Sequence, residues 1–402
     1  MTARRGPLTG LKVVELAHIM AGPVCGLMLA DMGADVIKVE KVPGGDDSRR
    51  FLPPDIGGES AAFMMMNRNK RGIAIDLKQD AGRDVLRRLL AGADAVIENY
   101  RQGTMERLGL GYETLRQTNP GLIYCEISGF GRSGPYAVRG GFDLIAQGMS
   151  GLMSITGEGA GRPPVKVGAP VTDITAGILG AMGVLAAYIE RQRSGRGQRV
   201  DTSLFEAGIT HSYWQSAITF ATGRSPGPMG SAHPLNAPYQ AFETADGWLN
   251  LGAANQANWL RMLAAIDAPE LADDPRFVDN AARIAHLEEL TAALNAVFRK
   301  RKTADWLERL EAAKVPAGPV LDIAEMHADP QTLAREMVVD APHARLGPVK
   351  TIGLPVKFSE TPGGVVAGAP LYGEHSREVL AEHGLSEDEI AALLEAGAVV
   401  AA

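Results

Sequence analysis

Short β-branched apolar runs alternate with segments of helical spacing through the first half of the chain. Residues 11–17 (LKVVELA) and 35–40 (DVIKVE) have the length and composition of buried strands. Residues 18–34 between them place apolar side chains at helical spacing and end near Gly33. A strand, a helix and a second strand in this order predict a βαβ unit, which joins two parallel strands.

The same pattern recurs further along the chain. Residues 72–77, 95–100 and 122–128 are predicted strands, and residues 81–93 and 112–118 are predicted helices between them. Repeated units of this kind favour a parallel sheet with helices on both faces. We therefore predict an α/β fold in which residues 1–205 form a Rossmann-like, doubly wound domain.

The second half of the chain differs in composition and in the pattern of its predicted elements. Residues 222–238 are rich in Gly and Pro, which is typical of a linker or an active-site loop. Residues 239–253 predict a β-hairpin that turns at Asp246 and Gly247, and helical segments follow to about residue 310. These elements predict a smaller α+β domain at 225–330. Residues 347–359 return to strand character, and residues 386–397 (SEDEIAALLEAG) predict a capped terminal helix.

Composition narrows the class of protein. The 402 residues are 46% hydrophobic and 5% aromatic with a formal net charge of -7, so we expect neither a nucleic-acid surface nor nucleic-acid partners. Two cysteines without metal-ligand spacing predict no metal site and fit a reducing, cytoplasmic location. The apolar run at 174–189 is shorter than the ~18 residues of a membrane span, which predicts a buried helix and no membrane partner.

Two patterns indicate ligand binding. Gly129, Gly131 and Gly134 fit a dinucleotide fingerprint, but a loop composition follows them where a helix would have to begin. Polar and cationic residues also recur where predicted strands end, at the edge where open α/β sheets bind ligands. They are Lys38, Lys41, Lys78, Asn99, Tyr100, Arg101 and Arg107. Together they suit a polyphosphate ligand, although each by itself is more often an ordinary solvated side chain.

Asp173 stands at the head of the long apolar run. One interpretation is a helix N-cap, because Asp accepts hydrogen bonds from the first-turn N–H groups. The other is a nucleophile, which the helix dipole would keep ionised even where little water reaches it. Residue physics alone leaves both interpretations open. His18, after the first strand, and His233, in the Gly/Pro-rich loop, are weaker candidates for substrate contact.

Several segments in this order resemble the class III coenzyme A transferases. They are PLTGLKVVELAHIMAGP, MGADVIKVEKVPGGDDSR, NRNKRGIAIDLK, DAVIENYRQGTMERLGLGYE, ISGFGRSGPYAVRGGFDLIAQGMSGLMSITG, GAPVTDITAG and SGRGQRVDTSLFEA. The resemblance implies transfer of CoA from an acyl-CoA to a carboxylic acid, with CoA thioesters as substrates and no permanently bound cofactor. It places the family's nucleophile on Asp173, which would form aspartyl anhydride and aspartyl-CoA thioester intermediates.

The resemblance also carries over the contacts to CoA. They fall on Met20, Ala21, Lys41, Ile75, Lys78, Asn99, Tyr100, Arg101, Arg107 and Arg139. Gly230 and other glycines of the loop near His233 are expected to stabilise oxyanions. Met20 stands where formyl-CoA transferases have a glutamine, which argues against oxalate as acceptor and leaves a dicarboxylate with succinyl-CoA as the expected pair.

The family's interlocked homodimer predicts a discontinuous large domain, 1–205 and 335–402, with linkers at 206–224 and 331–334.

Two alternatives have other functions. A 2-methylacyl-CoA racemase shares the resemblance but needs a His where this chain has Phe142, before Asp143. A non-catalytic CoA-binding protein would need no nucleophile.

Overall fold

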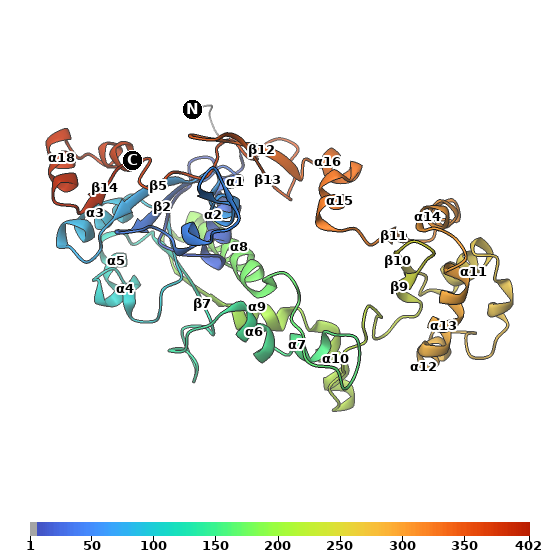
Figure 1. The fold of residues 1–402 in the computed structure, drawn as a ribbon. Coiled ribbons are helices and arrows are strands. Elements are labelled where there is room, and N and C mark those ends of the chain that lie inside the picture. The colour runs from blue at the N-terminus through green and yellow to red at the C-terminus, as the bar shows by residue number, and fades with distance from the viewer. Residues whose placement is uncertain (1–5) are drawn as a thin grey trace. The chain divides into compact units, whose positions relative to one another are not determined.

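In the computed structural model, which describes residues 6–402, the five strands predicted within residues 1–205 and two strands that were not predicted form one seven-stranded sheet (Figure 1). The order is β14-β5-β2-β1-β6-β7-β8, and every neighbouring pair is parallel except β14 with β5. The strands are β1 (Lys12–Glu15), β2 (Asp35–Lys41), β5 (Arg71–Ile75), β6 (Ala95–Glu98), β7 (Ile123–Ser128), β8 (Arg199–Ser203) and β14 (Val399–Val400). The six parallel strands follow the order of a doubly wound sheet, which reverses between β1 and β6.

Helices cover both faces of this sheet. Neighbouring residues of a strand point to opposite faces, so Val13 joins the core under α1 and α8 while Val14 joins the core under α3, α5, α17 and α18. The helices of the sheet domain are α1 (Ala21–Asp31), α3 (Asp80–Ala91), α4 (Thr104–Arg107), α5 (Tyr112–Thr118), α6 (Asp143–Met149), α8 (Val171–Ser194), α9 (Leu204–Thr210), α17 (Ser376–Glu382) and α18 (Glu387–Glu395). The predicted cap of α18 is confirmed, because Ser386 and Glu389 form a capping box.

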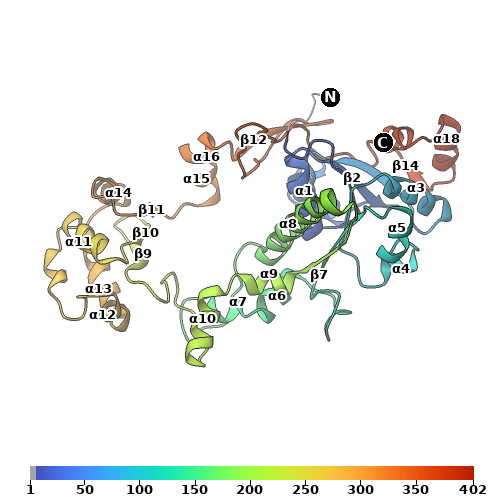
Figure 2. The same cartoon turned by 180° about the vertical axis from the view of Figure 1, so that it is seen from behind.

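Helix α8 packs directly against α1, as both Figure 1 and Figure 2 show. Gly177 permits this contact, since a Cβ there would lie 2.6 Å from the Ala21 carbonyl oxygen. At 24 residues, α8 is longer than the apolar run that predicted it. Among the described residues it is the one helix long and apolar enough to cross a membrane, but 39% of its most apolar window is buried within the chain. The helix expected to be buried is therefore only partly buried in the single chain.

The chain divides into two compact units. The larger comprises residues up to 150, 167–211 and 330–402, and the smaller comprises 151–166 and 212–329. The smaller unit thus takes in 151–166, which the sequence analysis placed within 1–205. Its elements are α7 (Leu152–Ile155), α10 (Tyr213–Thr222), β9 (Tyr239–Glu243), β10 (Trp248–Gly252), α11 (Gln256–Ala265), α12 (Asn280–Ala285), α13 (Leu287–Phe298), α14 (Thr303–Ala312), β11 (Ala317–Pro319), α15 (Ile323–Ala328) and a 3-10 helix (Pro269–Ala272).

Strands β9 and β10 form the predicted hairpin, and β11 pairs with the outer edge of β10. Short elements complete the larger unit. They are a 3-10 helix (Asp47–Arg50), β3 (Asp55–Ile56), β4 (Glu59–Ser60), α2 (Ala61–Asn67), α16 (Pro330–Ala334), β12 (Val338–His343) and β13 (Gly347–Ile352). The strand predicted at 347–359 ends at Ile352, after it has paired with β12.

Candidate active site

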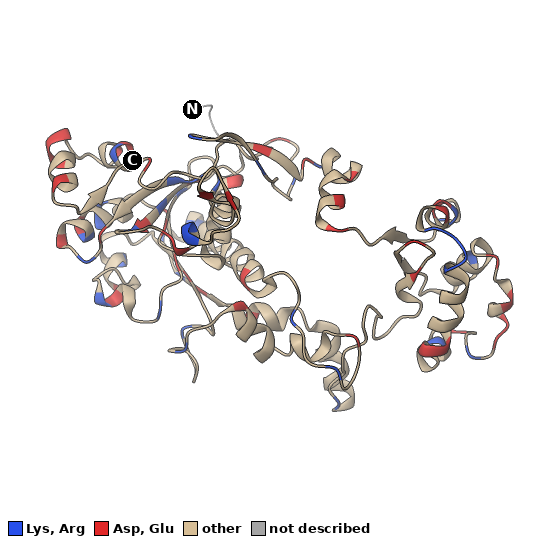
Figure 3. Cartoon of the chain, in the orientation of Figure 1, with Lys and Arg blue, Asp and Glu red and all other residues tan. Residues whose placement is uncertain are grey.

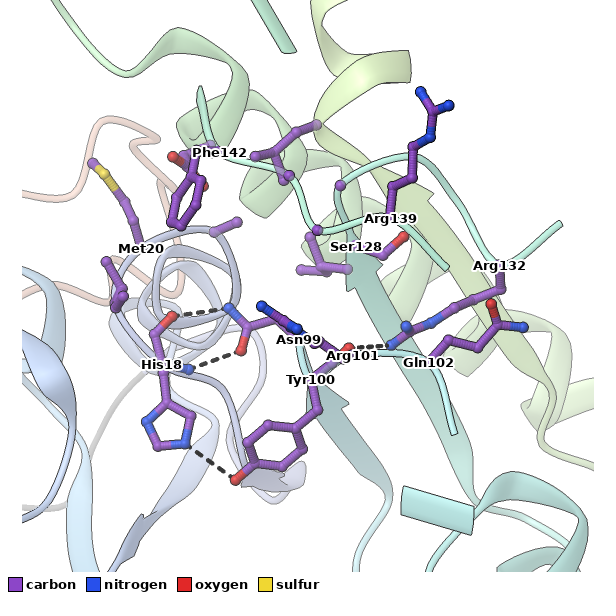
Figure 4. A pocket seen from close by; sticks show the side chains of 18 of the residues that line it. His18, Met20, Asn99, Tyr100, Arg101, Gln102, Ser128, Arg132, Arg139 and Phe142 are labelled. Carbon is purple, nitrogen blue, oxygen red and sulfur yellow. Dashed lines mark hydrogen bonds between the residues drawn. The ribbon is translucent and has the colours of Figure 1, made fainter. Parts of the chain in front are cut away.

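A cavity of about 390 Å³ opens at the carboxyl ends of β1 and β6, where the strand order reverses. This is the position at which open α/β sheets bind ligands. Eight of the predicted catalytic, CoA-binding and substrate residues line it, namely His18, Met20, Ala21, Asn99, Tyr100, Arg101, Arg139 and Asp173. They come from the segments after β1, β6 and β7 and from the first turns of α1 and α8. Figure 4 labels six of them, His18, Met20, Asn99, Tyr100, Arg101 and Arg139.

Asn99 ties two of these turns together. Its side-chain oxygen accepts from the His18 main-chain N–H at 2.9 Å, and its amide donates to the His18 carbonyl at 2.8 Å (Figure 4). Ile19, which follows His18, has φ of 66°, a left-handed conformation that a β-branched residue rarely adopts. The Ile19 N–H donates to the Asp46 carboxylate, which helps to hold that conformation. The turn that leads into α1 is therefore fixed from both sides.

The His18 ring also lies in this wall of the cavity. Its Nε2 lies 3.2 Å from the Tyr100 hydroxyl (Figure 4), and its buried Nδ1 has no hydrogen-bond partner in the described chain. Burial lowers the pKa of His18, and the charge of Lys38 lowers it further. His18 is therefore a neutral ring at pH 7, and it contributes shape rather than charge to the cavity.

The sequence predicted that Lys38 would face the ligand, but Lys38 does not line the cavity. Its side chain is fully buried within β2 and pairs with Glu15 at 3.0 Å and with Asp46 at 2.9 Å. Lys70 approaches the second Glu15 oxygen at 2.7 Å. Burial favours the neutral amine of Lys38, but the carboxylates of Glu15 and Asp46 outweigh it and raise the pKa of Lys38. Lys38 is therefore a structural cation beneath the site.

A second buried charged cluster lies beside the first and was missed by the sequence analysis. Arg132 bridges Glu98 at 2.7 Å and Glu126 at 3.0 Å, and it donates to the Tyr100 carbonyl at 3.0 Å. Burial raises the pKa of Glu98 to about 7, although Arg132 opposes the shift. The signal for this cluster was two glutamates inside the otherwise apolar strands β6 and β7. Its effect is to hold the turn that carries Tyr100 and Arg101.

The ten predicted CoA contacts separate into six that line the cavity and four that do not. Arg101 and Arg139 line the cavity without an ion pair to any described residue, and Arg139 stacks on Tyr136 at 4.1 Å. The other four lie outside the cavity lining. Lys41 pairs with Asp47 at 2.6 Å, Ile75 is buried in the core, Lys78 is exposed after β5, and Arg107 is exposed on α4.

Two further candidates belong to the smaller unit. The Gly230 N–H donates to the Gly157 carbonyl at 2.8 Å, so this donor is already engaged. The His233 ring lies between Trp214 and Tyr239, with centroids 6.0 and 5.2 Å away. Its Nδ1 accepts from the Leu235 N–H at 3.0 Å.

The glycine fingerprint has a structural explanation. A Cβ on Gly129 would lie 2.7 Å from the Gly141 main chain, so Gly129 and Gly141 allow two loop segments to touch. Gly131 and Gly134 have φ of 85° and 80°, a left-handed conformation that favours glycine. No helix begins at Gly134, and the next helix in the described chain is α6 at Asp143. The segment therefore lacks the helix start that a pyrophosphate would require. Within residues 6–402, no group of His, Cys, Asp and Glu side chains could hold a metal ion.

Asp173 is the third residue of α8, and the prediction that it caps the helix is wrong. Its carboxylate has no hydrogen bond or ion pair to any described residue, whereas Asp47, the other aspartate of the cavity, is paired with Lys41 and Arg50. Burial raises the pKa of Asp173 to about 7, and the charge of Asp143 adds to the effect. Both influences act against the ionised form that the helix start was expected to favour.

The sequence matches CoA-transferase family III over residues 8–376, so the chain belongs to this family and is a CoA-transferase. The succinate–glutarate CoA-transferase of Agrobacterium fabrum is 43% identical, covering 95% of this chain and 97% of the relative. The succinyl-CoA:mesaconate CoA-transferase of Haloarcula hispanica is 40% identical, covering 94% and 97%. The crystal structure of a CaiB/BaiF family protein from Brucella suis superposes with a TM-score of 0.85 at 42% identity, covering 94% of this chain and all of that one.

Proposed function

We propose that the protein transfers CoA from succinyl-CoA to a dicarboxylic acid, with Asp173 as the nucleophile. The observation that carries this proposal is the Asp173 carboxylate, which lies in the cavity at the reversal of strand order and has no partner among residues 6–402. A carboxylate without partners keeps its lone pairs available for attack on an activated acyl group. The acceptor class rests on the relatives, which are named for glutarate and mesaconate.

In the proposed reaction, an Asp173 oxygen attacks the thioester carbonyl, the C–S bond breaks, and CoA leaves as the thiolate. The thiolate then attacks the aspartyl carbonyl of the mixed anhydride, which releases succinate and leaves an aspartyl-CoA thioester. The acceptor carboxylate attacks this thioester to form a new anhydride and CoA thiolate. Attack of the thiolate on the acceptor's acyl carbon gives the product and restores Asp173. No oxidant, reductant or metal is required.

The cations near the site suit the phosphates of CoA. Arg101 and Arg139 have no ion pair within the described part of the chain, so they could bind a phosphate without first losing another ionic partner. We propose that Lys41, Lys78 and Arg107 contribute from outside the cavity lining, because they are exposed at the strand-end edge of the same sheet. Oxyanion donors from the loop near Gly230 would require its N–H to leave the Gly157 carbonyl.

A screen of acceptor acids with succinyl-CoA tests the proposed function. We expect C4 to C6 dicarboxylates to be converted to their CoA thioesters, with oxalate the poorest acceptor because Met20 offers no hydrogen bond to it. The measurement is chromatographic detection of the new thioester. Deuterium incorporation at the α-carbon of a 2-methylacyl-CoA without any acceptor would instead establish racemase activity. CoA binding without either reaction would establish a non-catalytic role.

We further propose that the protein forms a homodimer. On α8, Ile178, Met182 and Ile189 are 48%, 59% and 64% exposed in the single chain and share one helix face. Between Ile174 and Ile189 the helix carries no charged side chain, and most of the α8 ribbon is accordingly tan in Figure 3. An exposed apolar face of this kind is typical of a protein interface. Analytical ultracentrifugation should give a dimer mass, and Met182→Glu should shift the population toward monomer. A wild-type monomer at micromolar concentration would contradict the proposal.

A further inference from the structure

The first turn of α8 is capped by a residue from another helix. Asp143, at the start of α6, accepts from the Thr172 N–H at 3.0 Å and from the Thr172 hydroxyl at 2.8 Å. Pro170, the residue that precedes α8, makes no side-chain cap. Asp143 thus performs the role that the sequence pattern assigned to Asp173.

Asp143 is itself held in place by a buried amide. The Gln147 side chain, which is fully buried, donates to the second Asp143 oxygen at 2.7 Å. The Gln147 side-chain oxygen, Oε1, accepts from the Val167 N–H at 2.9 Å. The side-chain amide nitrogen, Nε2, also donates to the Ala169 carbonyl at 3.4 Å. The segment that enters α8 is therefore bound to α6 at two places. Gln147 contacts Val167 and Ala169 ahead of the helix, and Asp143 contacts Thr172, the residue before Asp173.

We propose that Asp143 is a positioning residue for Asp173, which caps α8 in its place and so leaves the Asp173 carboxylate unpaired at the cavity. This inference rests on the proposed function. Had Asp173 capped its own helix, its oxygens would accept first-turn N–H groups and would be turned away from a substrate. Division of the two tasks between two aspartates keeps the helix start satisfied and the nucleophile free.

Asp143 also makes Asp173 more basic, because two neighbouring carboxylates disfavour the ionisation of each other. The other charged groups on the elements packed against α8 are engaged elsewhere. Asp31 pairs with Arg68 at the far end of α1, Glu206 of α9 accepts from Ser203, and His211 contacts Thr175. On β7 and β8, Glu126 pairs with Arg132 and Arg199, and Asp201 accepts from the Arg132 N–H. Asp143 is accordingly the charged group that affects the pKa of Asp173.

Two variants separate the capping role from the charge. Asp143→Asn keeps an oxygen that can accept from Thr172 but removes the charge, whereas Asp143→Ala removes both. Asp84→Asn is the matched control, because it removes one carboxylate charge from an exposed site on α3. The measurement is the pH dependence of kcat/KM for succinyl-CoA, which reports ionisations of the free enzyme. Titration of the substrate's own phosphates is common to all variants and cancels in the comparison.

For the wild type and Asp84→Asn, we expect activity to fall on the acid side with a midpoint near pH 7, which is the Asp173 ionisation. In Asp143→Asn the removal of a neighbouring negative charge lowers the pKa of Asp173, so the midpoint should move about one unit lower. Its kcat at high pH should fall less than about tenfold, and that of Asp143→Ala about 10- to 100-fold, because the nucleophile is misplaced.

Wild-type kcat in Asp143→Ala would overturn the positioning role, whereas an unchanged midpoint in Asp143→Asn would overturn only the charge effect on Asp173. If Asp143→Ala fails to fold, Gln147→Leu is measured in its place, because it removes the amide that holds Asp143, and wild-type kcat in that variant would overturn the positioning role. Failure of the proposed function is distinguishable, since it appears in the wild type as the absence of any covalent adduct on Asp173, whatever the Asp143 variants do.

Discussion

Asp173→Asn is expected to lower kcat for CoA transfer by at least about 10³-fold, because a neutral amide cannot form the anhydride that the proposed reaction requires. Asp47→Asn is the matched control, since Asp47 is the other aspartate of the cavity and is paired with Lys41 and Arg50. Its effect should be confined to KM and be less than about tenfold. Steady-state assays with succinyl-CoA and glutarate measure both variants. An Asp173→Asn enzyme with more than a tenth of wild-type kcat would contradict the nucleophilic role.

The same variant should not lose stability. The pKa of Asp173 is raised from 3.8 to about 7 in the folded chain, so the folded state binds the proton more tightly than the unfolded state. The stability contributed by this group is present below the unfolded pKa and declines as the pH rises toward 7. Asp173→Asn removes that decline, and its Tm at pH 8 should equal or exceed that of the wild type. A clear loss of Tm would show that Asp173 has a structural role as well.

Lys38→Met is expected to lower the free energy of unfolding by about 3–5 kcal/mol. The substitution leaves Glu15 and Asp46 buried without the ammonium that lies 3.0 and 2.9 Å from them. Lys41→Met is the control on the same strand. Its partner Asp47 is 37% exposed, so the loss there should be below about 1 kcal/mol. Urea denaturation measures both, and equal losses in the two variants would contradict the assignment of Lys38 as the buried cation of a network.

Local patterns predicted most of the sheet domain. Apolar runs gave β1, β2, β5, β6 and β7 to within a few residues, because strands buried on both faces are continuously apolar. The position of Asp173 near the start of a long helix was also predictable from the sequence. The neighbours of that helix were not predictable, since the cap comes from Asp143, which lies 29 residues before Thr172, the residue that it caps.

Charge pairing across strands explains the main errors at the site. Lys38 was predicted to face a ligand because it lies near the end of an apolar run. In the sheet register it is the direct partner of Glu15 on β1, and Asp46 closes the other side. A charged residue within each of two adjacent buried strands was the available signal, but its interpretation requires the register. The Asp173 pKa was likewise predicted from its own helix alone, whereas burial and Asp143 decide it.

Chemical trapping tests the central claim most directly. The enzyme is incubated with succinyl-CoA without an acceptor, treated with hydroxylamine and digested, and the modified peptide is mapped by mass spectrometry. Hydroxylamine displaces CoA from an aspartyl thioester, so we predict a hydroxamate on Asp173 that is absent without succinyl-CoA and absent from Asp173→Asn. A hydroxamate on any other residue, or product formation without any trapped adduct, would contradict the account.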